Sequence, residues 1–105
     1  MNGIEHPEKI IVKVDPDLEP LIPDFLRNRR EAVNAVRDAL ARGDFETVRL
    51  LGHNWRGDGS AYGFDRVTQI GVEMEKAGQA GEADIVRRLA DELAAYLARV
   101  EVDYN

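Results

Sequence analysis

At 105 residues, 44% of them hydrophobic, the chain has room for one domain with one modest core. It contains no cysteine, which excludes disulfides and thiol nucleophiles, and its formal net charge of −6 argues against nucleic acid as a partner. No apolar run approaches the roughly 20 residues that span a bilayer, and the N-terminus lacks the basic and then apolar order of a signal peptide, so we expect a cytoplasmic protein with no membrane partner.

The first 14 residues read as a lead-in without helical periodicity. Residues 10–14 form a short β-like apolar run for which no partner strand is evident, so we expect an extended segment lying against the body. Asp15, followed by a proline, fits the N-cap of a helix. Pro20 and Pro23 would interrupt that helix, which predicts one short helix before the first long one.

Four longer stretches carry apolar side chains every three or four positions: about 23–43, 44–63, 65–81 and 82–102. Glycines close the first three, and Asp44 and Asp65 stand where the second and third would begin. Helices joined by such short turns are most simply antiparallel neighbours. The sequence therefore predicts an all-α, antiparallel up-down four-helix bundle over residues 15–105, with leucines of the last helix completing the core of a monomer.

His53 lies in the second predicted helix, within a segment (residues 51–64) that also holds the only tryptophan and four of the nine glycines. At about 100° per residue, His53 falls about 130–150° from the centre of the apolar stripe. The imidazole should therefore face solvent. Because glycine costs roughly 1 kcal/mol in a helix interior, we interpret the glycines around His53 as giving a large partner access to the ring.

Three residues share the predicted face of His53. Arg56, Gly57 and Ser60 follow it by three, four and seven residues, which places them on the same side of a helix. An arginine one turn away could pair with an anion attached to the imidazole, and the glycine would leave the ring uncrowded. The pattern predicts a nucleophile that carries a charged group and is approached by another protein.

The sequence His-Asn-Trp-Arg-Gly at residues 53–57, followed by Gly63-Phe64 and Met74-Glu75, resembles the histidine-containing phosphotransfer (HPt) domain family. The core of that family reads His-x-(apolar)-(Lys/Arg)-Gly, with a later Gly-apolar pair and an apolar-Glu or apolar-Gln pair. The resemblance covers residues 15–104, including the order of the helices and the position of the histidine midway along the second long helix. It implies a protein of a two-component phosphorelay.

The resemblance implies a role for each matching position. His53 would accept a phosphoryl group from the aspartyl phosphate of a response-regulator receiver domain or of a hybrid histidine kinase, and pass it to another receiver. Arg56, where most members have lysine, would offset the phosphoryl charge. Gly57 would give the receiver room, and Glu75 would hydrogen-bond the imidazole and fix its tautomer. On the residues alone, Glu75 could equally be a solvated helix carboxylate.

We include Arg49, Asn54 and Ser60 as further candidates for partner binding, on a contact surface expected from the first and second long helices. The resemblance implies no cofactor of the chain's own, because the receiver would supply Mg²⁺. It also implies a phosphoryl carrier rather than an autonomous enzyme, since 105 residues leave no room for an ATP-binding kinase domain. His6, the other histidine, is too distant along the chain to suggest a metal pair.

Two positions depart from the family pattern. Asp58 stands where a small residue is usual, at the edge of the apolar stripe, so we expect it to be turned outward or paired, with Arg66 or Arg37 as partner. Trp55 is bulkier than the usual leucine but equally apolar, and we expect it in the core. These departures leave an alternative function open: a non-catalytic adaptor or inhibitor that binds a receiver or histidine kinase. A purely structural bundle is a third, weaker reading.

Overall fold

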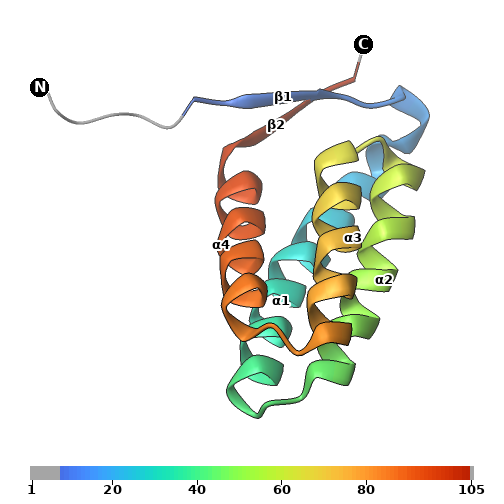
Figure 1. The fold of residues 1–105 in the computed structure, drawn as a ribbon. Helices are drawn as coiled ribbons and strands as arrows, with labels where there is room; N and C mark the ends of the chain where they lie inside the picture. Colours follow the sequence, from blue (N-terminus) through green and yellow to red (C-terminus); the bar gives the residue numbers. More distant parts are fainter. Residues whose placement is uncertain (1–7, 105) are drawn as a thin grey trace, which may run out of the picture.

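The computed structural model describes residues 8–104, where four helices pack side by side and two short strands cross one end (Figure 1). The elements are β1 (Ile10–Lys13), a 3-10 helix (Pro16–Leu21), α1 (Ile22–Ala41), α2 (Phe45–Tyr62), α3 (Asp65–Ala80), α4 (Ala83–Arg99) and β2 (Val100–Asp103). The predicted all-α four-helix bundle is confirmed. His6, considered above as a metal ligand, lies outside the described residues.

The ends of the helices follow the predicted capping chemistry. Asp44 caps α2, because its side chain accepts a hydrogen bond of 3.1 Å from the backbone N–H of Thr47. Gly63 and Gly81 end α2 and α3 with φ angles of 85° and 68°, in the left-handed region that glycine adopts without a steric penalty. Asp15 caps the 3-10 helix through the backbone N–H of Asp17 at 2.9 Å. The short helix predicted before the first long one is thus present as a 3-10 helix.

Two predictions about the ends of the chain are wrong. Residues 10–13 do have a partner strand, because β1 pairs in parallel with β2, Ile10 opposite Val100. For the same reason the last helix does not continue to Val102: α4 ends at Arg99 and the backbone of Val100 is extended. Val100 and Val102 alternate with charged residues, which suits a strand, and β-branched residues favour one. The pairing joins positions about ninety residues apart in the sequence, so no local pattern reveals it.

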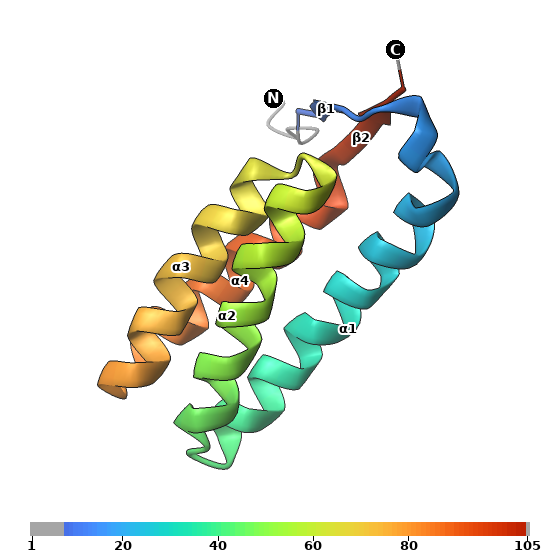
Figure 2. The ribbon, with the colours of Figure 1, turned by 90° about the vertical axis from the view of Figure 1, so that its right-hand side faces the viewer.

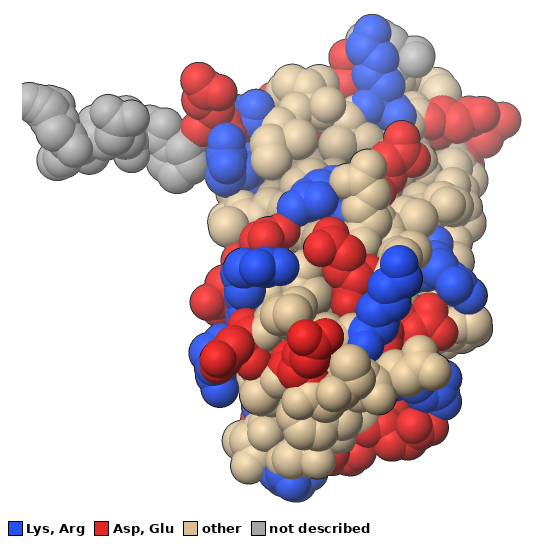
Figure 3. Space-filling view, in the orientation of Figure 1, with Lys and Arg blue, Asp and Glu red and all other residues tan. Residues whose placement is uncertain are grey.

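The core is made by apolar side chains from all four helices. Trp55 is fully buried, which confirms its predicted place in the core. Leu89, Leu93 and Leu97 of α4 are also buried within the single chain, so they complete the core as predicted. On the face seen in Figure 3, Lys and Arg are interspersed with Asp and Glu. Within residues 8–104, no helix is both long and apolar enough to cross a membrane.

Helices α2 and α3 approach each other at glycines, and they lie side by side in both Figure 1 and Figure 2. A Cβ atom at Gly52 of α2 would lie 2.5 Å from the backbone nitrogen of Glu75, and one at Gly71 of α3 would lie 2.6 Å from that of Arg56. Gly59 and Gly78 are crowded in the same way. Only glycine permits so close an approach of the two backbones, which brings α3 beside the face of α2 that carries His53.

Candidate functional site

The side chain of His53 lies midway along α2 and is 51% exposed, as predicted from its place off the apolar stripe. Its Nδ1 atom lies 3.2 Å from Oε2 of Glu75, which reaches across from α3. Glu75 is only 20% exposed and is therefore not a solvated helix carboxylate. The structure brings these two side chains, 22 residues apart in the sequence, into contact.

Arg56 closes this pair into a cluster of three side chains. Its Nη2 atom lies 3.1 Å from Nδ1 of His53, and its Nη1 atom lies 3.3 Å from Oε1 of Glu75. All of these contacts to the imidazole are made at Nδ1. No residue among 8–104 hydrogen-bonds Nε2, so the second ring nitrogen is left for a reactant that approaches from outside the protein.

The glycines near His53 have different surroundings, and the interpretation that they all give access to the ring is wrong. Gly52 and Gly59 face α3 and are required by the close packing of the two helices. Gly57 alone matches the interpretation, because a Cβ atom placed there would meet no atom within 4 Å. The reason for expecting a contact surface from α1 and α2 therefore fails at Gly52 and Gly59, and the partners of His53 come from α2 and α3.

The remaining candidates lie on the same helix with contacts of their own. Arg49 is held by Glu46 through two hydrogen bonds of 3.0 and 2.6 Å. These bonds raise the pKa of Arg49, and the negative charge of Glu75 adds a smaller contribution. Ser60 is exposed and its hydroxyl lies 3.3 Å from that of Thr68 on α3. Asn54 is exposed beside His53 in the sequence.

A family model described as Hpt domain matches residues 20–103. The chain belongs to the Hpt domain family. Membership implies histidine phosphotransfer in two-component phosphorelays, in which receiver domains and histidine kinases are the partners of Hpt domains. No match was found among the curated proteins or among the solved structures.

In this Hpt domain, Asp58 pairs with Arg29 of α1 at 3.2 Å, and not with Arg66 or Arg37 as predicted. Arg66 instead pairs with Glu92. The side chain of Arg29 is only 13% exposed, and burial lowers the pKa of its guanidinium while Asp58 opposes that change. The sequence could not reveal this partner, because Arg29 lies in a run of exposed charges on α1.

Sequence reasoning also missed Leu50, an exposed apolar side chain one turn before His53. Leu50 is 46% exposed, whereas most large apolar side chains of the described residues are buried or partly buried. Its place outside the apolar stripe of the second helix was the available signal. An exposed leucine beside the imidazole adds apolar surface of the kind used in protein contacts.

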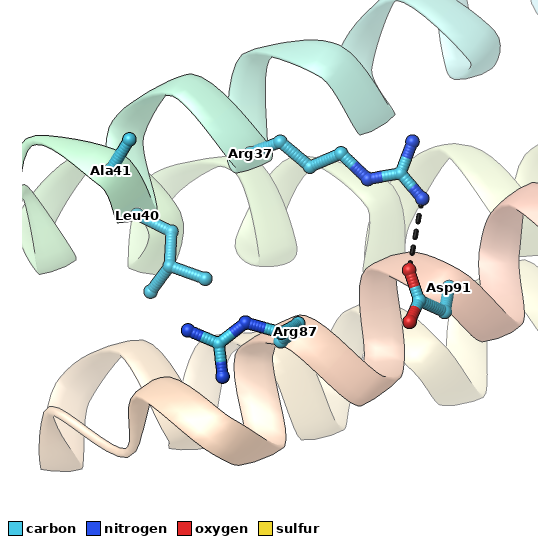
Figure 4. Close-up of a pocket in the computed structure, with 5 residues that line it drawn as sticks. All are labelled: Arg37, Leu40, Ala41, Arg87 and Asp91. Atoms are coloured by element: carbon cyan, nitrogen blue, oxygen red, sulfur yellow. Dashed lines mark hydrogen bonds and ion pairs between the residues drawn. The ribbon is translucent and has the colours of Figure 1, made fainter.

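A hollow of about 460 Å³ lies between α1 and α4, away from the cluster at His53 (Figure 4). It is lined by Arg37, Leu40, Ala41, Arg87 and Asp91. Both arginines already have carboxylate partners, Asp91 at 2.9 Å and Asp84 at 2.8 Å. None of the predicted site residues lines this hollow. Among the described residues, no group of three or more His, Asp or Glu side chains is placed to hold a metal ion.

Proposed function

We propose that this Hpt domain accepts a phosphoryl group on Nε2 of His53 from the aspartyl phosphate of a receiver domain and passes it to another receiver. The observation that supports the proposal is the half-exposed imidazole whose Nδ1 atom is engaged by Glu75 while Nε2 has no partner among the described residues. A histidine nucleophile needs one nitrogen with a free lone pair and the other oriented by a hydrogen bond.

The transfer step requires no base beyond this arrangement. With the proton on Nδ1 and donated to Glu75, the lone pair of Nε2 attacks phosphorus, the N–P bond forms, and the P–O bond to the aspartate breaks. The aspartate leaves as a carboxylate, and the ring becomes a phosphorylated imidazolium whose positive charge Glu75 stabilises. The reverse sequence returns the group to an aspartate. Both the acyl phosphate and the phosphoramidate are high-energy species, so transfer can run in either direction.

Other residues near the ring would serve the phosphoryl group and the partner. Arg56 is placed to bind phosphoryl oxygens, and its planar guanidinium can bind two of them where lysine offers a single point charge. Gly57 would leave space for the receiver, and Arg49, Asn54 and Ser60 would contact it. Mg²⁺ is proposed as the receiver's ion, since the chemistry contributed by this chain needs only an imidazole, a carboxylate and a guanidinium.

The test is transfer of ³²P from phosphorylated receivers to the purified chain. We expect a label that is lost in acid, kept in base and located on His53 by mass spectrometry. His53→Gln should abolish labelling, while His6→Gln, which removes the only other histidine, should retain it. Labelling of the His53→Gln variant would show that the site assignment is wrong. A chain that binds phosphorylated receivers but takes no label would be an adaptor instead.

A further inference from the structure

Arg56 and Glu75 contact the same ring atom of His53, and they place opposite demands on it. The guanidinium of Arg56 can only donate hydrogen bonds, and its Nη2 atom lies 3.1 Å from Nδ1. The carboxylate of Glu75 can only accept them, and its Oε2 atom lies 3.2 Å from the same nitrogen. In the neutral imidazole, Nδ1 carries either a proton or a lone pair, so it can satisfy only one of these partners at a time.

The two choices give imidazoles of different reactivity. When Nδ1 carries the proton and donates it to Glu75, the lone pair lies on Nε2, which is the nitrogen left open to a reactant. When Nδ1 accepts a hydrogen bond from Arg56, the proton lies on Nε2, and that nitrogen cannot attack. Glu75 therefore favours the reactive tautomer, whereas Arg56 favours the unreactive one.

We propose that Arg56 is a positioning residue that holds part of the resting His53 in the unreactive tautomer and releases it when phosphoryl oxygens arrive. The inference rests on the proposed function and assigns Arg56 a second task within it. Its side chain is 46% exposed and makes single contacts of 3.1 and 3.3 Å, so it is free to turn toward a better partner. A phosphoryl group with several charged oxygens is such a partner, because it can bind the guanidinium at two points.

The charges around the ring are consistent with this exchange. Once Arg56 turns to the phosphoryl group, Glu75 is left as the only described hydrogen-bond partner of Nδ1 and can stabilise the positive ring that forms. Arg49, held in place by Glu46, keeps a positive charge acting on Glu75 after Arg56 has left. The net change replaces an Arg56–Glu75 contact with an Arg56–phosphoryl contact and an imidazolium–Glu75 contact.

The first experiment measures the tautomer directly. Long-range ¹H–¹⁵N NMR spectra distinguish a protonated Nδ1 from a protonated Nε2, and they should be recorded about two pH units above the ordinary imidazole pKa of about 6.5, where the ring is neutral. The full chain carrying His6→Gln gives a single histidine signal. We expect both tautomers in this background. Arg56→Ala should raise the ratio of the Nδ1-protonated to the Nε2-protonated form by about threefold or more, and Glu75→Ala should lower it.

The matched control is Arg87→Ala, which removes an exposed arginine of α4 that pairs with Asp84 and has no contact with His53. This variant should leave the tautomer ratio unchanged. An equal ratio in the Arg56→Ala variant and its parent would overturn the inference. Because the ratio is measured without any phosphoryl donor, it stands or falls independently of whether His53 is phosphorylated.

The second experiment tests release, with two electrophiles of different charge. Diethyl pyrocarbonate is neutral and transfers an ethoxycarbonyl group to an unprotonated ring nitrogen, with ethyl carbonate leaving. Phosphoramidate is anionic and transfers its phosphoryl group, with ammonia leaving. Arg56→Ala should speed modification of His53 by the neutral reagent by about two- to fivefold, because more of the ring is in the reactive tautomer. The same variant should slow phosphorylation, because the guanidinium no longer binds the phosphoryl oxygens.

Opposite changes in the two rates are the signature of the proposed role, since a merely structural effect would change both in one direction. If Arg56→Ala slows or speeds both reactions alike, the release of His53 by Arg56 is wrong. If phosphoramidate does not label His53 even in the parent chain, the proposed function fails, while the tautomer ratios still decide whether Arg56 opposes Glu75.

Discussion

Gly52 and Gly57 lie five residues apart in α2 and are needed for different reasons. At Gly52 a side chain would collide with the backbone of α3, so this glycine sets the distance between the two helices and thereby the reach of Glu75 to His53. At Gly57 a side chain would enter open space, so nothing in the isolated chain requires a glycine there. A requirement imposed by a docking partner accounts for a glycine that its own fold does not need.

Alanine at these two positions should therefore have opposite effects on stability. Gly57→Ala should raise the free energy of unfolding by up to about 1 kcal/mol, because alanine is the better helix former. Gly52→Ala should lower it by about 1–3 kcal/mol, because backbone atoms must move to admit the methyl group. Urea denaturation of both variants measures these changes. A Gly52→Ala variant as stable as the parent would show that α2 and α3 can separate without cost.

The same Gly57→Ala variant separates access from stability. It should take up phosphate from the small donor phosphoramidate at the parental rate, but from a phosphorylated receiver more slowly, because the methyl group lies on the surface that the receiver approaches. Stopped reactions with the two donors provide the measurement. Equal rates from the receiver in variant and parent would mean that Gly57 has no role in docking.

Asp58 is the carboxylate partner of a guanidinium that is largely buried. Arg29 is 13% exposed, its Nε atom is buried without a partner among the described residues, and its guanidinium lies 5.5 Å from the ring of Phe25. Asp58→Ala should lower the free energy of unfolding by about 1 kcal/mol, the modest end of the usual range, because Asp58 is half exposed and solvent screens the pair.

A double-mutant cycle with Arg29→Met checks this origin of the stability. If the pair is responsible, Asp58→Ala should cost less in the Arg29→Met background than in the parent, since no buried charge is left unpaired. Equal costs in both backgrounds would show that Asp58 acts through some other contact. The departure of Asp58 from the family pattern is then explained by its partner on α1 rather than by the chemistry at His53.

At the level of elements, the sequence predicted the helices because their signals are local. The apolar period of α2, the cap at Asp44 and the glycines at 63 and 81 all act within a few residues, so one sequence suffices to place them. The contact between His53 and Glu75 was reached only through the family resemblance, because it depends on how α3 packs on α2. The tie between Arg56 and Nδ1 and the pairing of Asp58 with Arg29 depend on side-chain geometry that no spacing encodes.

The cap of α2 makes the helix sensitive to acid. Hydrogen bonds from the hydroxyl and the backbone N–H of Thr47 lower the pKa of Asp44 in the folded protein below its unfolded value. A lowered folded-state pKa stabilises the protein above the unfolded pKa of about 3.9, and this contribution is lost as the pH falls through the folded pKa.

Asp44→Asn provides the comparison, because asparagine also caps helices but does not titrate. The parent should be more stable than this variant at neutral pH, and the difference should shrink as the pH is lowered below about 4. Thermal unfolding of both proteins over a series of pH values measures it. A difference that stays constant down to the lowest pH would show that the charge of Asp44 contributes nothing to the cap.

On the scale of the whole molecule, the strand pair closes the bundle by joining its two ends. One face of the pair, which carries Ile10, Val12, Val100 and Val102, packs against the core, and Val14 continues the contact by donating its backbone N–H to the carbonyl of Asp103 at 2.9 Å. Two short strands are only marginally stable by themselves, so their stability must come from the helices beneath them.

Val12 and Ile11 allow a matched test of that dependence, because they are neighbours in β1 that point to opposite faces. Val12 is partly buried against the core, whereas Ile11 is 54% exposed. Val12→Thr should lower the free energy of unfolding by about 1 kcal/mol, because it places a hydroxyl where a methyl group packed. Ile11→Thr should stay within about 0.5 kcal/mol of the parent. Urea denaturation gives both values, and hydrogen exchange should show the amides of β1 and β2 opening more easily in Val12→Thr while those of α2 and α3 stay protected. Equal losses in the two variants would mean that the strands do not draw their stability from the bundle.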